Sequence, residues 1–319
     1  MNTTHWLMSA RQSLLISLSS ALLLLSLLAC QPIAIDNQAQ LLRQTFTSEY
    51  DQTQRQYFVY LPKGYHQSDT LWPVMLFLHG NGERGDGQAE LDFVLSHGPL
   101  YEAWIQKREL PFVIIAPQLP MFDFDKQGLG YIDNRRLEDV PVRLKQGTVT
   151  RAAYCQSTQS MLRHSTITTM QDIEPLPPKG WETIENDLLS ILNATTEQFK
   201  TDPEHIYLTG LSYGGFGTWY LASQHPKLFT AIAPVVAWGH PDMMSPIAKQ
   251  DIPLWVFAGG RDSTINIEYF YPGLNTLEAL GHSQVRFTVH EELEHDAWKR
   301  VYASEDLYRW FLSHKKTQH

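Results

Sequence analysis

The chain beyond residue 55 alternates short apolar runs with longer stretches in which apolar residues recur at helical spacing. The short runs are rich in Val, Ile, Leu and Phe with little polar alternation, as is typical of strands buried on both faces of a sheet. This order of elements predicts a mostly parallel sheet with helices on both faces. The predicted strands are 57–61, 74–78, 112–116, 206–209, 231–236, 254–258 and 285–289.

The clearest helix is predicted to begin near Trp181. Its apolar residues Ile184, Leu188, Ile191 and Leu192 fall at helical spacing, and acidic residues concentrate near its start, where the helix macrodipole favours them. Further helices are predicted directly after residue 212, at 267–280 and at 306–314.

Residues 119–180 form a long stretch without helical or strand periodicity, rich in Gly, Pro, Thr and Gln. Connections in compact domains usually span about 4–6 residues, so this stretch is an insertion. It leaves the carboxyl end of a predicted strand, the edge where doubly wound folds bind their ligands. We expect a cap that shapes a substrate site, and inert decoration is the alternative.

A serine flanked by glycines follows the predicted strand at 206–209. The sequence Gly210-Leu211-Ser212-Tyr213-Gly214 lies between a strand and a helix, the setting that a nucleophile elbow requires. The serine of such an elbow sits on a strained turn, so the residues two before and two after it must lack bulky side chains. Gly210 and Gly214 meet this demand. We predict Ser212 as a nucleophile, with an ordinary turn before a helix as the alternative.

A nucleophilic serine needs a base that takes its proton and a carboxylate that orients the base. With a nucleophile elbow, the chain order is serine, then acid, then histidine. Asp262 and His295 each follow a predicted strand, so both emerge at the sheet edge that holds Ser212. We predict Asp262 as the acid and His295 as the general base. The rival acid is Glu268, and the rival histidines are His282 and His290.

A glycine-rich loop, His79-Gly80-Asn81-Gly82-Glu83-Arg84-Gly85, follows the predicted strand at 74–78. Its glycines fit a dinucleotide-binding fingerprint, but that motif also needs a helix opening at the loop, and the next residues predict more loop. We instead expect half of an oxyanion hole. In that interpretation a backbone amide near Asn81 and the amide of Tyr213 face the developing negative charge.

Two histidines near the end of the chain, His290 and His295, flank a run rich in glutamate. A zinc-protease helix places its histidines four residues apart on one face, whereas these are five apart. We therefore predict no metal and no cofactor. Trp238 follows a strand and Trp298 follows the predicted base, so both are candidates for an aromatic substrate pocket, with core packing as the alternative.

The first thirty residues predict export. Arg11 precedes an apolar run at 14–28 that small polar residues interrupt, the outline of a signal peptide, with an uncleaved membrane anchor as the alternative. The tetrad Leu27-Leu28-Ala29-Cys30 resembles the bacterial lipobox, which implies a lipid on Cys30. The residue that follows, Gln31, is not aspartate, and the resemblance then implies the outer membrane, facing the periplasm.

Composition narrows the choice of partners. The chain has 319 residues and a net charge of −9, and no more than two Lys or Arg residues are consecutive anywhere in it, as at Lys315-Lys316 near its end. Nucleic acid is therefore not expected as a partner, because its recognition needs clustered Lys and Arg. The remaining cysteine, Cys155, has no partner for a structural disulfide if Cys30 carries lipid.

Several motifs together resemble bacterial secreted α/β-hydrolases described as predicted peptidases or phospholipase/carboxylesterases, near the feruloyl esterases and polyhydroxybutyrate depolymerases. The matching segments are Tyr60-Leu61-Pro62-Lys63-Gly64-Tyr65, the loop 77–85, Ala116-Pro117-Gln118, 206–215, 253–257 and His295-Asp296-Ala297-Trp298. The resemblance implies the α/β-hydrolase fold and an ester substrate, small or attached to a polymer. The chain departs from the family at Tyr213, where methionine is common, and in its long insertion.

The sequence thus predicts a signal peptide at 1–29, a tether at 30–54 and an α/β-hydrolase domain at 55–319 with an insertion at about 119–180. A serine carboxylesterase that works through an acyl-enzyme is the leading hypothesis. The alternatives are a serine peptidase related to the prolyl oligopeptidases and a lipoprotein that binds cell-envelope material without catalysis.

Overall fold

The computed structural model describes residues 37–316 apart from 156, 159, 161–166 and 168. The chain divides into two units, Met1–Asn37 and Gln38–His319, and the description below concerns the second. The predicted signal peptide and Cys30 lie outside the described residues. No helix within the described part is both long and apolar enough to span a bilayer.

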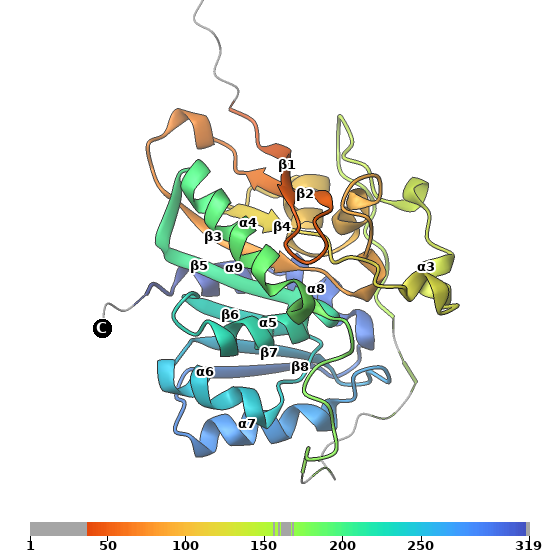
Figure 1. Cartoon of the computed structure of the whole chain (residues 1–319), viewed down its shortest axis with the longest axis vertical. Coiled ribbons are helices and arrows are strands. Elements are labelled where there is room, and N and C mark those ends of the chain that lie inside the picture. The colour runs from red at the N-terminus through yellow and green to blue at the C-terminus, as the bar shows by residue number, and fades with distance from the viewer. Residues whose placement is uncertain (1–36, 156, 159, 161–166, 168, 317–319) are drawn as a thin grey trace, which may run out of the picture. The chain divides into compact units, whose positions relative to one another are not determined.

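The second unit is built on an eight-stranded sheet with the strand order β1-β2-β4-β3-β5-β6-β7-β8. The strands β1 and β2 are antiparallel, as are β2 and β4, and every other pair is parallel. Figure 1 shows β5 to β8 running side by side. The strands are β1 (Gln40–Thr47), β2 (Gln54–Leu61), β3 (Trp72–Leu78), β4 (Val113–Ala116), β5 (Thr201–Leu211), β6 (Ala231–Val235), β7 (Leu254–Gly259) and β8 (Val285–His290).

Every strand predicted from the sequence is present, and the mostly parallel arrangement is confirmed. The tether predicted at 30–54 is wrong over its second half, because β1 pairs with β2 along its whole length. The strand β1 has only intermediate and exposed residues, so it carries no buried apolar run by which the sequence would announce it. It is an edge strand, and β2 is its only neighbour in the sheet.

The helices lie on both faces of the sheet, and the residues of each strand alternate between the faces. In β3, Val74 and Leu76 join a core cluster with α4, α5, α6 and α7. Met75 and Phe77 point the other way, into a cluster with α2, α8 and α9. The helices are α2 (Gly98–Leu100), α3 (Gly130–Asp133), α4 (Glu185–Gln198), α5 (Tyr213–Gln224), α6 (Met244–Gln250), α7 (Phe270–Ala279), α8 (Trp298–Ala303) and α9 (Asp306–Leu312).

Short helical turns complete the secondary structure. Each predicted helix is confirmed, and the first and third begin with such a turn. The turns are η1 (Tyr65–Gln67), η2 (Asn81–Glu83), η3 (Leu91–Ser96), the π-helical η4 (Tyr101–Ile105), η5 (Phe124–Lys126), η6 (Leu137–Asp139), η7 (Trp181–Ile184), η8 (Pro241–Met243), η9 (Ile267–Tyr269) and η10 (His295–Ala297).

The described residues of the insertion at 119–180 contain no strand, and their only helical pieces are η5, α3 and η6. The segment leaves the carboxyl end of β4 and returns at η7, directly before α4. It therefore starts at the sheet edge where the parallel strands β3, β5, β7 and β8 also end. Loops at this edge carry the site described next.

Candidate active site

Ser212 sits on a strained turn between β5 and α5, with φ +51° and ψ −117°. A Cβ atom on Gly210 would lie 2.2 Å from the carbonyl oxygen of Gly214, and one on Gly214 would lie 1.9 Å from that of Leu78. Neither approach is possible for a residue with a side chain, so only glycine permits this turn. This contact is the steric demand that the sequence analysis assigned to the two positions.

The turn is also fixed by hydrogen bonds. The Ser212 N–H donates to the carbonyl oxygen of Val235 at 2.9 Å, which ties the turn to the end of β6. The Ser212 carbonyl accepts from the N–H of Phe216 at 3.1 Å, the first bond of α5. The side chain of Ser212 is therefore held at the start of a helix, where the dipole favours negative charge.

The structure brings the three predicted side chains together. His295 Nε2 lies 3.0 Å from Ser212 Oγ, and His295 Nδ1 lies 2.7 Å from Asp262 Oδ2. The other oxygen of Asp262 accepts the backbone N–H groups of Thr264 and Ile265, each at 2.8 Å. The Asp262 side chain is only 1% exposed. One carboxylate oxygen is thus bound to the backbone, and the other is left to orient the imidazole.

Two glycines allow the loop that follows β7 and carries Asp262, the acid loop, to meet the loop that follows β8 and carries His295. A Cβ on Gly259, at the end of β7, would lie 2.2 Å from the carbonyl oxygen of Glu294, and one on Gly260 would lie 2.7 Å from the Cα of Glu291. The N–H of Arg261 donates to the Leu293 carbonyl at 3.0 Å. The backbone before His295 therefore lies directly against the backbone before Asp262.

The rival residues lie elsewhere. Glu268 is in η9, where its backbone N–H donates a hydrogen bond to Asn266 Oδ1. Glu268 does not line the cavity at Ser212. His282 lies 3.4 Å from Asp251, and His290 ends β8. Neither histidine lines that cavity.

The glycine-rich loop passes beside the serine. Asn81 begins η2 and Tyr213 begins α5, and both line the same cavity as Ser212. The first N–H groups of a helix have no partner within the helix, so both amides are donors of the kind that an oxyanion hole uses.

His79 holds the loop in place as a neutral imidazole. Its Nδ1–H donates to the Gly80 carbonyl at 2.6 Å, and its Nε2 accepts the Leu119 N–H at 2.9 Å, which fixes the tautomer. Complete burial lowers the pKa of His79 to about 3. The indole N–H of Trp181 donates to the His79 carbonyl at 3.2 Å.

The cavity at Ser212 has a volume of about 880 Å³ and a mostly apolar wall. Trp238 and Trp298 both line it, as the sequence analysis predicted. Trp238 also packs against Phe216, with ring centroids 4.9 Å apart, so it belongs to the core as well. Trp298 lies edge-on to His295 at 5.1 Å. The insertion supplies a large share of the wall: Tyr131, Arg135, Arg136, Asp139, Val140, Ile173, Glu174, Leu176, Pro177 and Pro178.

Comparison with known proteins places this arrangement in a known fold. Residues 182–251, which include Ser212 but neither Asp262 nor His295, match the model of the prolyl oligopeptidase family. A solved thermostable esterase is similar over 86% of this chain and 63% of its own, with 22% identity and a TM-score of 0.59. The chain has the α/β-hydrolase fold.

Other solved structures with this fold match over nearly their whole length. A ferulic acid esterase is 16% identical over 86% of this chain and 96% of its own, with a TM-score of 0.52. The S-formylglutathione hydrolase of Staphylococcus aureus is 12% identical over 88% of this chain and 99% of its own, with a TM-score of 0.53. The chain spans less than two thirds of the length of the thermostable esterase. No curated protein sequence matches the chain significantly.

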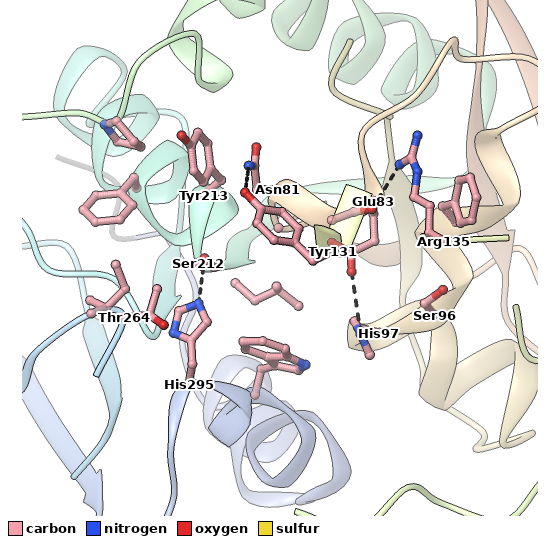
Figure 2. Close-up of a pocket in the computed structure, with 18 of the residues that line it drawn as sticks. Asn81, Glu83, Ser96, His97, Tyr131, Arg135, Ser212, Tyr213, Thr264 and His295 are labelled. Atoms are coloured by element: carbon pink, nitrogen blue, oxygen red, sulfur yellow. Dashed lines mark hydrogen bonds and ion pairs between the residues drawn. The ribbon is translucent and has the colours of Figure 1, made fainter. Parts of the chain in front are cut away.

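The wall of the cavity also contains a pair of polar residues, Glu83 and His97, that the sequence did not predict. In Figure 2, Glu83 and His97 lie across the cavity from Ser212 and His295. Glu83 Oε1 is 3.6 Å from His97 Nε2. Burial raises the pKa of Glu83 to about 7 and lowers the pKa of His97. The two groups come from neighbouring loops, and no spacing in the sequence announces their contact.

The raised pKa of Glu83 predicts a pH-dependent stability. An ordinary glutamate has a pKa of 4.5, so the unfolded chain ionises first, and stabilisation by the neutral carboxyl is lost as the pH rises from about 4.5 to about 7. Glu83→Gln stays neutral. Relative to wild type, its free energy of unfolding should therefore improve by about 3 kcal/mol between about pH 4 and about pH 8.

Urea unfolding of both proteins at the two pH values measures this difference. Glu109→Gln, at a glutamate that is exposed at the surface, is the control. An equal difference between Glu83→Gln and wild type at both pH values would contradict the assignment of a neutral, buried carboxyl.

Proposed function

We propose that the protein is a serine hydrolase that cleaves carboxylic esters through a covalent acyl-enzyme. Ser212 is the nucleophile, His295 the general base and Asp262 the acid that orients the base. One observation carries this proposal: the hydrogen-bonded chain from Asp262 through His295 to Ser212, with distances of 2.7 and 3.0 Å, on a strained turn that faces a large cavity.

The reaction follows from this chain. His295 Nε2 takes the hydroxyl proton as Ser212 Oγ attacks the ester carbonyl carbon. The imidazolium, stabilised by the carboxylate of Asp262, then gives the proton to the departing alkoxide, which leaves as an alcohol. Water, deprotonated by the same histidine, attacks the acyl-enzyme and releases the carboxylic acid and free Ser212. The backbone amides of Asn81 and Tyr213 stabilise the oxyanion of both tetrahedral intermediates.

Esters are favoured over peptides as substrates. An alkoxide leaves more easily than an amine, so ester cleavage needs no proton donor beyond His295. Two of the similar solved structures are described as esterases. The match to the prolyl oligopeptidase family over 182–251 favours the second candidate, a serine peptidase.

The cavity favours an ester with a bulky, uncharged apolar part. Its volume of about 880 Å³ far exceeds the needs of a short acyl group. The arginines on its wall are engaged within the described structure, Arg135 with Glu90 at 3.1 Å and Arg136 with Asp139 at 3.0 Å. A carboxylate on the substrate would compete with these bonds. Trp238 and Trp298 instead offer aromatic surfaces to an apolar part of the substrate.

Loss of the nucleophile tests the proposal. Ser212→Ala should lower the turnover of p-nitrophenyl esters about a million-fold and abolish labelling by a fluorophosphonate, because no other group replaces the attacking oxygen. Ser223→Ala, at a buried serine of the same helix, is the matched control and should retain both. Mass spectrometry of the labelled wild type should find the adduct on Ser212. Wild-type turnover in Ser212→Ala would rule out this nucleophile.

A substrate panel separates the candidate functions. We expect p-nitrophenyl esters with aromatic or long acyl chains to be hydrolysed faster than the acetate, and aminoacyl amides to be poor substrates, for the leaving-group and cavity reasons given above. Robust amide cleavage with negligible ester turnover would favour the peptidase. A wild type that neither turns over esters nor reacts with a fluorophosphonate would favour the lipoprotein that binds without catalysis.

We further propose that the protein is exported and held at the outer membrane, facing the periplasm, by a lipid on Cys30. The support is the apolar run at 14–28 and the tetrad ending in Cys30. Cys30→Ser should lose labelling by radioactive palmitate and leave the membrane fraction, with Cys155→Ser as the control. Continued labelling of Cys30→Ser in the membrane fraction would refute the lipid anchor.

A further inference from the structure

The buried side chain of Arg84 connects the glycine-rich loop to both ends of the insertion. Arg84 is fully buried. Its Nη1 and Nη2 donate to the carbonyl oxygens of Pro120 and Lys179, each at 2.8 Å, and its Nε donates to Oδ1 of Asn81. The guanidinium also lies over the ring of Tyr213, 5.0 Å from its centroid. It therefore contacts both residues whose amides form the proposed oxyanion hole.

The guanidinium fixes the orientation of the Asn81 side chain. Arginine has five donors and no acceptor, so the amide of Asn81 must turn its oxygen toward Arg84. Its nitrogen then points the other way and donates to the hydroxyl oxygen of Tyr131 at 2.7 Å. The direction of both bonds is thus set by a group that can only donate.

The direction of these bonds leaves the hydroxyl proton of Tyr131 free. Tyr131 belongs to α3 in the insertion and lines the cavity at Ser212. Its oxygen accepts from Asn81, so its O–H must donate elsewhere, and no acceptor for it is found in the described part of the chain. In Figure 2 the Tyr131 ring lies between Ser212 and Glu83, with its hydroxyl at Asn81.

We propose that Tyr131 is a catalytic residue whose hydroxyl donates a third hydrogen bond to the oxyanion, aimed by Arg84 through Asn81. The inference rests on the proposed function. Each bond of the chain Arg84, Asn81, Tyr131 points the same way, from a buried cation toward the cavity, and such chains polarise their members and strengthen the last donor. The insertion then supplies part of the catalytic machinery in addition to the cavity wall.

Tyr131→Phe tests this role directly. Loss of a buried oxyanion donor costs about a hundred- to a thousandfold in rate, and Tyr131 is 57% exposed, so we expect kcat to fall by about tenfold to a hundredfold. KM should change little, because the bond forms with the transition state. The rate of fluorophosphonate labelling should fall with kcat. Tyr154→Phe, in the same insertion but off this cavity, is the matched control.

Asn81→Asp tests the direction of the chain. This change keeps the backbone amide and the bond from Arg84, but a carboxylate can only accept, so Tyr131 must now donate to it and not to the oxyanion. Asn81→Asp should therefore lose as much in kcat as Tyr131→Phe, and the double variant should lose no more than either alone.

The outcomes separate this inference from the proposed function. An active wild type with an unimpaired Tyr131→Phe overturns the role of Tyr131 and leaves the function standing. Losses that multiply in the double variant overturn the chain through Asn81. A wild type without ester turnover and without labelling overturns the proposed function, and this inference with it.

Discussion

The contact between the turn at Ser212 and the end of β3 is the constraint on which the site depends. The Gly214 backbone lies so close to the carbonyl of Leu78 that a side-chain carbon would overlap it. This contact exposes the serine on a strained turn and also fixes where the chain leaves β3. The glycine-rich loop therefore begins beside Ser212, and Asn81 lines the same cavity as Tyr213.

The same principle operates on the other side of the serine. Gly259 and Gly260 let the backbone of the acid loop lie against residues 291–294, so Asp262 and His295 meet although they leave different strands. Side chains at these glycines would separate the loops by more than a hydrogen bond tolerates. The geometry of the three side chains thus follows from close backbone contacts at the carboxyl ends of β5, β7 and β8.

These contacts explain which features the sequence could predict. The buried strands, the elbow and the order of Ser212, Asp262 and His295 follow local rules of periodicity and turn chemistry, and the structure brings those side chains together. The strand β1 escaped prediction because an edge strand with half-exposed residues has no apolar run. The pair Glu83 and His97 and the bond from Asn81 to Tyr131 join separate loops, and no local pattern encodes such contacts.

In the proposed function, the insertion contributes both to substrate specificity and to catalysis. A single guanidinium, that of Arg84, accepts no hydrogen bond and donates to the carbonyls of Pro120 and Lys179, so both ends of the segment are held at one point beside the elbow. The described residues between them that line the cavity belong to loops and short helical pieces outside the sheet, so their side chains can vary without disturbing it. A buried cation has a desolvation cost, which lowers the pKa of Arg84 to about 10. Its bonds and its position over Tyr213 offset that cost only while the insertion stays in place, so the insertion that lines the cavity and the glycine-rich loop proposed to bind the oxyanion depend on each other.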